Sequence, residues 1–271
     1  MSITSIKIKH LEIDKYILNF EILPDERWGI FSRNKETVRI FINQLNGIKE
    51  NQNTCFMNDI DLFDDKDYFK ARVYLNFKDS YINSIKAKNV KSDIYKRYKK
   101  CLDIKKFEET IETLQTRCEC EIKNRYIFTQ KGNTFLNCAF AYALEKQMLI
   151  VSNPTINVKE INEKKEIARR ITDINAEGIA FICLDSLACF EGTLDKVIIL
   201  DDFNNVRIID PKKDTFVLVD DYPSNEDILK EKVFDCVDKT IIYNLNNDNI
   251  KECKRLGKCE VLSFYQIEDY L

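Results

Sequence analysis

The chain has 271 residues, a net charge of −3 and a hydrophobic fraction of 44%, values that fit one large globular domain or one domain with an appendage. So small a net charge creates no strong field that would favour nucleic acid or acidic lipid as a partner. Only six glycines are present, which argues against a function that depends on glycine-rich loops.

The first third of the chain predicts strands followed by one amphipathic helix. Residues 4–31 have the pattern of three short strands with a turn, and residues 37–47 have that of a helix. The apolar face of this helix is formed by side chains at helical spacing: Val38, Phe41, Ile42 and Leu45. The stretch FKARVYLNF, residues 69–77, predicts a further strand.

The middle of the chain predicts a helical region and then a buried strand. Residues 78–126 are basic and polar with few interleaved aromatic residues, so we expect a solvated helical face rather than a nucleic-acid patch. The stretch TFLNCAFAYAL, residues 134–144, is apolar nearly all round and predicts a buried helix. MLIVS, residues 148–152, is typical of a strand in a parallel sheet covered on both faces.

The following segments alternate between helix and strand patterns, which predicts a parallel α/β core. In chain order they are a charged helix at 159–174, a strand at 179–184, a helix at 186–194 (SLACFEGTL) and strands at 196–200 and 206–210.

The last sixty residues repeat this rhythm on a smaller scale and predict a small α+β appendage. Strands are expected at 215–220, 239–245 and 259–265, and helices at 225–237 (NEDILKEKVFDCV) and 247–257. The stretch DDYPSNED, residues 220–227, is the expected boundary, because it combines a proline with candidate helix N-caps.

The ten cysteines are expected to be reduced thiols in a cytoplasmic protein. No apolar run approaches the ~20 residues that cross a bilayer, and the N-terminal stretch lacks the apolar core of a signal peptide. We do not expect a zinc site, because His10 is the only histidine and the cysteine pairs lack the usual spacing of zinc ligands. These pairs are Cys118 with Cys120 and Cys253 with Cys259.

Four segments, in this order, resemble the nucleotide-binding subunit of an ABC transporter over nearly the whole chain. FEILPDERWGIFSRN (20–34) resembles the strand that leads to the Walker A loop, and GNTFLNCAFAYALEKQMLIVSNPT (132–155) resembles the signature helix and the Walker B strand. IAFICLDSLACFEGTLDKVIILDD (179–202) is similar to the segment that carries the switch histidine. IKECKRLGKCEVLSFYQIEDYL (250–271) resembles the C-terminal appendage of bacitracin- and lantibiotic-exporter subunits.

The resemblance implies an ABC-ATPase-like α/β core with a helical insertion and a small α+β C-terminal appendage. The implied ranges are 1–77 and 149–221 for the core, 78–148 for the helical subdomain with a degenerate signature, and 222–271 for the appendage. It also leads us to expect Trp28–Phe31 and Leu149–Val151 to be neighbouring parallel strands of the core.

The Walker A chemistry is missing at the aligned positions. Glycines are needed there because the backbone must curl with positive φ and point its amides at phosphates, and a lysine must neutralise those phosphates. Aligned without a gap, the glycines fall on Ser32, Lys35 and Thr37, the lysine on Val38 and the Mg²⁺-binding hydroxyl on Arg39.

The other catalytic elements are degenerate as well. The Walker B aspartate falls on Ser152 and the general-base glutamate on Asn153, and neither side chain can accept a proton or balance a metal charge. The switch histidine falls on Asp185. The usual glutamine falls on Asn76 or Phe77, and the signature becomes QKGNT, residues 130–134, with Gly132 alone retained.

The leading hypothesis is therefore a pseudo-ATPase: a subunit without catalytic residues or a bound cofactor, acting as a structural or regulatory partner of an ABC-type transport system. Peptide export or antibiotic immunity is the type of system that the C-terminal ending suggests. The expected location is the cytoplasm, at the inner face of the membrane through a transporter partner.

Two surfaces are expected to bind partners. An ABC-type subunit would bind the face that carries Lys131, Gly132, Asn133 and Thr134 together with the loop SRNKET at 32–37, and membrane-spanning subunits would bind the basic helical insertion. Tyr126, Phe128 and Phe135 are candidates for an aromatic centre of this interface, and the alternative places the same aromatic residues in the core.

Two alternatives stay open. One is an ATPase with rewired contacts, which binds Mg-ATP weakly through Arg33, Lys35 and Arg39. Such an enzyme would need a carboxylate near the nucleotide, and the candidates are Asp185, Asp201 and Asp202. The other alternative is an unrelated α/β binding module, which a different order of strands in the sheet would indicate.

Overall fold

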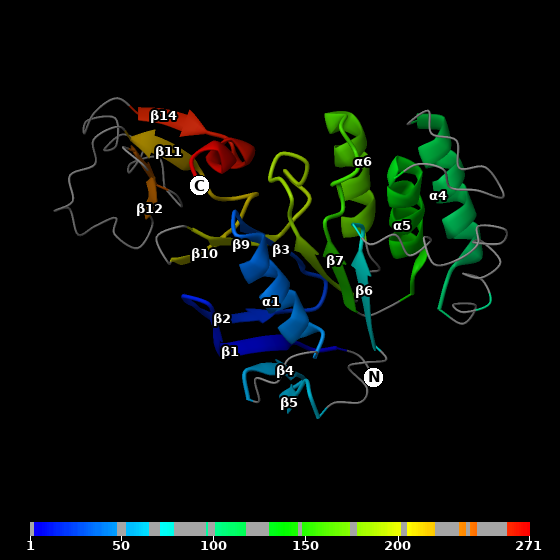
Figure 1. Ribbon diagram of the computed structural model, residues 1–271, viewed down its shortest axis with the longest axis horizontal. Helices are drawn as coiled ribbons and strands as arrows, with labels where there is room; N and C mark the ends of the chain where they lie inside the picture. The colour runs from blue at the N-terminus through cyan, green and yellow to red at the C-terminus, as the bar shows by residue number, and fades with distance from the viewer. Residues whose placement is uncertain are drawn as a thin grey trace.

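The computed structural model describes residues 3–47, 53–64, 71–78, 96, 101–117, 130–145, 148–173, 178–201, 205–219, 233–236, 239–242 and 259–271. Within these ranges Figure 1 shows three groups of strands: an N-terminal antiparallel sheet, a central sheet flanked by helices, and a C-terminal sheet beyond one end of the central one.

The central sheet is the parallel core that the sequence predicts. Among the described residues its strands are ordered β10-β9-β3-β8-β7-β6, all parallel except β10, which runs antiparallel to β9. Their bounds are β3 Arg27–Ser32, β6 Arg72–Asn76, β7 Met148–Ser152, β8 Ile179–Cys183, β9 Lys196–Leu200 and β10 Val206–Ile209. Every residue of β7 and β8 is buried, as expected for strands covered on both faces.

The expectation that β3 and β7 are neighbours is wrong. Trp28 of β3 pairs with Phe181 of β8, and Phe181 pairs in turn with Ile150 of β7, so β8 lies between the two strands. A continuous apolar strand reveals that it is buried on both faces, but the pattern does not identify its neighbours.

The N-terminal sheet covers one face of the core. Its strands β1 (Ile6–Ile13), β2 (Tyr16–Ile22), β4 (Cys55–Met57) and β5 (Ile60–Asp61) are antiparallel in the order β2-β1-β4-β5. The three strands expected within residues 4–31 are therefore confirmed as β1, β2 and β3, whereas β4 and β5 carry too few residues to give a sequence pattern. This sheet shares one hydrophobic core with helix α1 (Lys35–Leu45) and with alternate residues of the central strands, such as Ile150.

The opposite face of the central sheet packs against helices α5 (Gln130–Ala143) and α6 (Ile161–Thr172). The α5 helix is buried along nearly its whole length, which confirms the prediction from its apolar sequence. Helix α4 (Ile104–Arg117) packs on α5 and starts where the Asp103 carboxylate accepts a hydrogen bond from the Lys106 amide at 3.0 Å.

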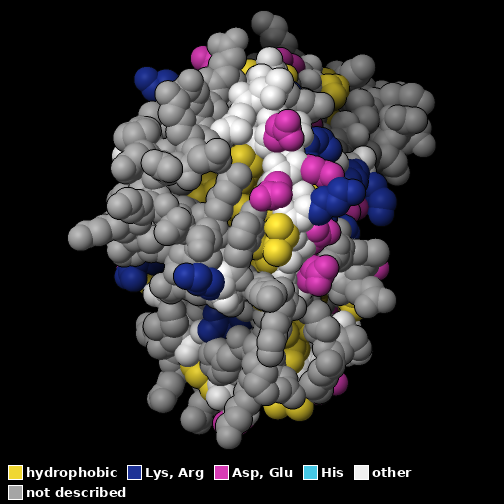
Figure 2. All heavy atoms as spheres, turned by 90° about the vertical axis from the view of Figure 1, so that its right-hand side faces the viewer, with side chains coloured by type: hydrophobic (Ala, Val, Ile, Leu, Met, Phe, Trp, Pro, Cys, Tyr) yellow, Lys and Arg dark blue, Asp and Glu magenta, His cyan; other side chains and the backbone are white. Residues whose placement is uncertain are grey.

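The exposed side of α4 carries charges of both signs. Lys105 pairs with Glu109 across one helical turn at 3.8 Å, and both side chains are exposed. Figure 2 views the side on which α4 lies and shows acidic and basic side chains of the described residues next to one another. This mixture fits the solvated face expected for the described part of the basic segment. No helix among the described residues is long and apolar enough to cross a membrane.

The C-terminal sheet differs from the prediction in two respects. Its strands β11 (Phe216–Val219), β12 (Val233–Cys236), β13 (Lys239–Ile242) and β14 (Cys259–Leu262) are antiparallel in the order β12-β13-β11-β14. The strand β12 lies where a helix was expected, because pairing with β13 overrides the local helix pattern. The strand β11, which lies within the range expected for the core (149–221), pairs here with β13 and β14, and the expected helix at 247–257 lies outside the described residues.

Residues 186–194, expected to be a helix, form successive turns instead. The Phe190 amide bonds to the Leu187 carbonyl at 3.1 Å, the Thr193 amide bonds to the Phe190 carbonyl at 3.1 Å, and Gly192 adopts a φ of +73°. This left-handed glycine ends any helical path, and the apolar side chains of the segment are buried in the core.

We predict that Phe41→Ala strongly destabilises the chain. Phe41 is fully buried between the N-terminal sheet and the central sheet, with its ring centroid 6.1 Å from that of Phe20 and 5.2 Å from that of Phe181. Truncation of a buried phenylalanine typically costs about 3–5 kcal/mol. Urea unfolding followed by circular dichroism measures this loss, and Arg39→Ala on the exposed face of α1 is the control, expected to change stability by no more than about 0.5 kcal/mol.

Candidate functional site

The connection between β3 and α1 consists of Arg33 and Asn34 alone. The helix starts at Lys35, two residues earlier than expected, because the Asn34 side chain caps it. Its Oδ1 accepts hydrogen bonds from the backbone amides of Glu36 at 3.0 Å and Thr37 at 3.4 Å. A phosphate loop uses the amides at a helix N-terminus to bind phosphate. Here a side chain of the same chain already occupies two of them.

The side chains aligned with the phosphate-binding positions have other partners. Val38, which the resemblance aligns with the lysine, is buried in the core beneath α1. Arg39 bonds to the Glu36 carboxylate on the exposed face of the helix. Lys35 places its Nζ 5.3 Å from the centroid of the Phe31 ring. The three cations of the ATP-binding alternative are therefore not gathered at one point, since Arg39 is engaged with Glu36.

The residues at the end of β7, Ser152 and Asn153, have neutral side chains. Asn153 follows Ser152 with a φ of +52°, a left-handed conformation that asparagine tolerates. Its Nδ2 donates to Oδ1 of Asn76, at the end of β6, at 3.1 Å. Of the two residues aligned with the glutamine, Asn76 therefore lies beside the end of β7, whereas Phe77 is fully buried.

The loop after β8 brings Asp185 to the same edge of the sheet. Both Asp185 carboxylate oxygens accept from the hydroxyl of the buried Thr155, at 2.8 Å each. The two cysteines that flank this loop are inert thiols at neutral pH. Burial raises the pKa of Cys183 to about 12 and that of Cys189 to about 11.

Asp201, the second candidate carboxylate, has a structural role. It is buried and accepts from the Asn205 amide at 2.8 Å and from Asn205 Nδ2 at 3.0 Å, so it links the end of β9 to the start of β10. Asp202 lies outside the described residues.

A cleft of about 460 Å³ lies at the carboxyl ends of the parallel strands, where ligands bind in open α/β sheets. It is lined by Phe31, Arg33, Lys35, Asp185, Glu268 and Asp269. Two of these six residues are basic and three are acidic. Arg33 and Lys35 were expected near a phosphate and Asp185 near a metal, and the structure places these three residues together.

Glu268 and Asp269 were not identified from the sequence. They belong to the 3₁₀ helix η3 (Phe264–Asp269), which follows β14. The resemblance covers this ending, but no local pattern indicates that η3 reaches a cleft built around residue 33. Among the described residues no group of three or more side chains is arranged to hold a metal ion.

The expected partner face is mostly internal. Gly132, Asn133 and Thr134 are buried in the first turns of α5, and Thr134 accepts a hydrogen bond from Asn157 at 3.2 Å. The side chain of Lys131 is partly exposed and bonds to Glu163 of α6 at 2.6 Å.

The aromatic centre proposed for that face is wrong for Phe135, which is fully buried and belongs to the core, as the alternative predicted. Tyr126 and Phe128 lie outside the described residues.

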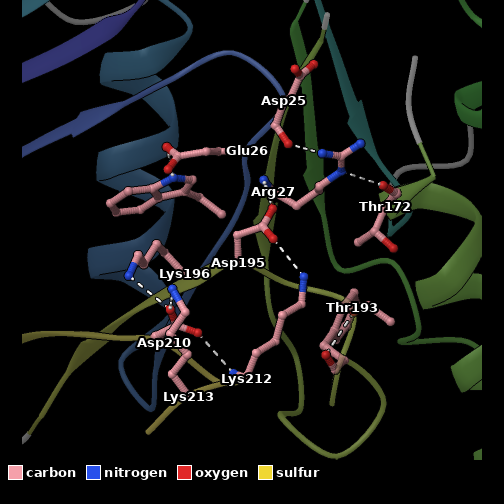
Figure 3. Close-up of polar contacts among 12 residues, drawn as sticks. Asp25, Glu26, Arg27, Thr172, Thr193, Asp195, Lys196, Asp210, Lys212 and Lys213 are labelled. Atoms are coloured by element: carbon pink, nitrogen blue, oxygen red, sulfur yellow. Dashed lines mark hydrogen bonds and ion pairs between the residues drawn. The ribbon is translucent and has the colours of Figure 1, made fainter. Parts of the chain in front are cut away.

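A second polar cluster lies at the amino ends of the same strands and is structural (Figure 3). Asp195 accepts from the Arg27 amide at 2.9 Å and from Lys212 Nζ at 2.7 Å, and so joins β3 to the turn after β10. Lys196 donates to Asp210 at 3.3 Å. Burial alone would raise the pKa of Asp210, but hydrogen bonds from the Lys212 amide and the lysine side chains outweigh it and lower the pKa. These charged side chains pair with one another and join neighbouring strands, so the cluster fits a structural role better than a ligand site.

Comparison with known proteins shows the fold. No protein-family model matches the chain, and neither does any curated protein. The solved structures that resemble it include CbiO1 from Clostridium perfringens, part of the ABC transporter complex CbiONQ, with a TM-score of 0.55 and 13% identity over 78% of this chain and 90% of that one. An ATP-binding subunit of an ABC transporter matches with a TM-score of 0.55 and 16% identity over 72% and 85% of the two chains.

A third similar structure is an ABC transporter described as metal-chelate type, in an inward-facing conformation. It has a TM-score of 0.55 and 10% identity over 76% of this chain and 83% of that one. At such low identity these likenesses concern the fold alone. The chain has the mixed α/β fold of ABC transporter ATP-binding subunits, which confirms the fold expected from the sequence.

We predict that Cys183 and Cys189 resist alkylation in the folded chain. At pH 8 both thiols are protonated, because their pKa values of about 12 and about 11 lie well above that pH, and both are shielded from the reagent. Iodoacetamide labelling followed by peptide mass spectrometry measures this, with the half-buried Cys259 as the internal control. Equal labelling of Cys183 and Cys259 before unfolding would contradict the packing of this edge of the sheet.

Proposed function

We propose that the chain is a degenerate ABC ATPase-like subunit that does not hydrolyse ATP and acts as a structural or regulatory partner of an ABC-type transport system. The observation that carries the proposal is the capped β3–α1 connection. The amides of Glu36 and Thr37 bond to Asn34, so a triphosphate would have to displace a covalently attached ligand to reach them.

The chemistry around that connection supports the same proposal. At the end of β7, Ser152 and Asn153 provide neither a base nor a charge for magnesium. Removal of one preorganised electrostatic group typically lowers the rate of an enzyme by about 10²–10³. Several such groups are replaced here at once, which favours the absence of hydrolysis over an ATPase with rewired contacts.

The cleft is also electrostatically unfavourable for a nucleotide. Arg33 and Lys35 face three carboxylates, those of Asp185, Glu268 and Asp269. A triphosphate carries several negative charges, and like charges at close range repel. The weak ATP-binding alternative would need these carboxylates to be protonated or moved.

A subunit that keeps this fold without its chemistry has a role as a binding partner. We place the contact with an ABC-type subunit around Lys131, beside the turn after β7 and the start of α6. Ile156 is 45% exposed and Ile161 is 46% exposed there, and the Lys131–Glu163 ion pair links α5 to α6 next to them. Exposed apolar side chains of this kind provide the centre of an interface.

Membrane-spanning subunits are the second proposed partners, through the helical region that contains α4. This assignment places the chain at the cytoplasmic face of a membrane. The resemblance of the ending 250–271 to bacitracin- and lantibiotic-exporter subunits is what suggests peptide export or immunity as the type of system.

We predict that the chain gives no saturable heat when it is titrated with Mg-ATP up to about 1 mM. A site with a Kd of about 1 mM would have a binding free energy of only about −4 kcal/mol. We also predict phosphate release no faster than from buffer. Calorimetry and a phosphate assay measure the two quantities, and a competent ABC ATP-binding subunit is the positive control. Saturable heat that the double variant Arg33→Ala/Lys35→Ala abolishes, or phosphate release that Asp185→Asn abolishes, would favour the rewired ATPase.

We predict that the tagged chain recovers an ABC-type or membrane-spanning transporter subunit from the lysate of its native organism, identified by mass spectrometry. Ile156→Asp is expected to lower recovery of the ABC-type subunit about tenfold or more, because it places a charge at the centre of the proposed interface. Ile208→Asp, on the outer strand β10, is the matched control and is expected to leave recovery unchanged. Recovery of no such subunit, together with a monomeric native chain, would refute the partner role.

A further inference from the structure

Helix η3 reaches from the C-terminal sheet to the carboxyl edge of the central sheet, and Glu268 makes the polar contact there. Its Oε2 accepts from the Leu187 amide at 2.7 Å and from the Ser186 hydroxyl at 3.0 Å. The main-chain oxygen of the same residue accepts from Arg33 Nη2 at 3.4 Å. One residue of η3 thus bridges the loop after β8 and the connection after β3.

The position of η3 is fixed by apolar packing. Phe264 is 4% exposed, Ile267 is fully buried, and both belong to the core that also contains Phe31 and Leu187. The Phe264 ring lies 6.4 Å from that of Phe216 on β11. Figure 1 shows η3 as the red coil between the C-terminal sheet and the central sheet.

The start of η3 is closed by a local hydrogen-bond pair. Gln266 Oε1 accepts from the Ser263 amide at 2.8 Å and from the Ser263 hydroxyl at 2.7 Å. This capping interaction fixes the start of η3, and the buried Ile267 fixes the residue directly before Glu268. The carboxylate is therefore presented by an ordered turn that is packed on the core.

The donors that Glu268 occupies are of the kind that bind anions. Backbone amides and hydroxyl groups donate hydrogen bonds to phosphate oxygens, and ligands of open α/β sheets bind at the carboxyl ends of the strands. The Glu268 carboxylate satisfies both donors, and Asp185 and Asp269 add negative charge beside it. A second anion would find both donors already bonded, and the cleft lined by more acidic than basic side chains would repel it.

We propose that the segment Phe264–Asp269 is a built-in plug of the cleft, in which the Glu268 carboxylate takes the place of an anionic ligand such as a phosphate group. This inference rests on the proposed function, which treats the cleft as a former nucleotide site. It adds that the chain supplies its own anion there, so that the loop 184–187 is ordered without any nucleotide.

The test is hydrogen exchange at the Leu187 amide in the full chain, alone and with inorganic pyrophosphate as the anion. In Glu268→Ala the amide loses its charged acceptor, so its exchange is expected to accelerate roughly tenfold or more. Pyrophosphate is expected to restore protection in this variant and to change nothing in the native chain, where the donors are already bonded.

Asp269→Asn is the matched control, because it removes one negative charge from the same cleft and leaves both Glu268 hydrogen bonds in place. It is expected to leave the Leu187 exchange rate unchanged. If Glu268→Ala does not fold, Glu268→Gln keeps the size and one acceptor oxygen, and a rise of severalfold over Asp269→Asn is expected.

Equal exchange rates in the Glu268 and Asp269 variants would overturn the plug, and so would added protection of the native Leu187 amide by pyrophosphate. Hydrolysis of ATP by the native chain is measured separately. It tests the proposed function, and its result does not depend on the exchange rate of the Leu187 amide. The two failures are therefore distinguishable.

Discussion

The hydrogen bonds from the Glu36 and Thr37 amides to Asn34 Oδ1 are the constraint on which the rest of the site depends. They let α1 begin after a connection of only two residues, which is too short to surround a phosphate. An asparagine N-cap typically stabilises a helix by about 1 kcal/mol. The early start also brings Val38 onto the buried face of α1, where a phosphate-binding lysine could not remain without losing its solvation.

The same principle extends along the carboxyl edge of the central sheet, where the polar groups bond to one another. Asn153 bonds to Asn76, Thr155 to Asp185, and Glu268 to the loop after β8. Each pair satisfies a donor or an acceptor that would otherwise need water or a ligand. The chain thus has the fold of ABC transporter ATP-binding subunits, and internal partners satisfy the polar groups at this edge.

The sequence predicted those elements whose apolar composition alone indicates burial. The β7 run MLIVS and the apolar α5 sequence are buried whatever their neighbours, so both predictions are confirmed. Features that depend on distant pairing were missed. The strand β8 separates β3 from β7, and Glu268 enters the site across more than two hundred residues of chain. No local periodicity contains that information.

The most direct test of the account follows the amide resonances of Glu36 and Thr37 in a ¹⁵N-labelled chain while Mg-ATP is added. If Asn34 holds these amides, their chemical shifts stay constant to about 1 mM nucleotide, whereas Asn34→Gly, which lacks the capping oxygen, shifts both resonances even without nucleotide. Saturable shifts of the two native amides on addition of Mg-ATP would show that phosphate displaces Asn34, and would contradict the claim that the chain has closed its own phosphate site.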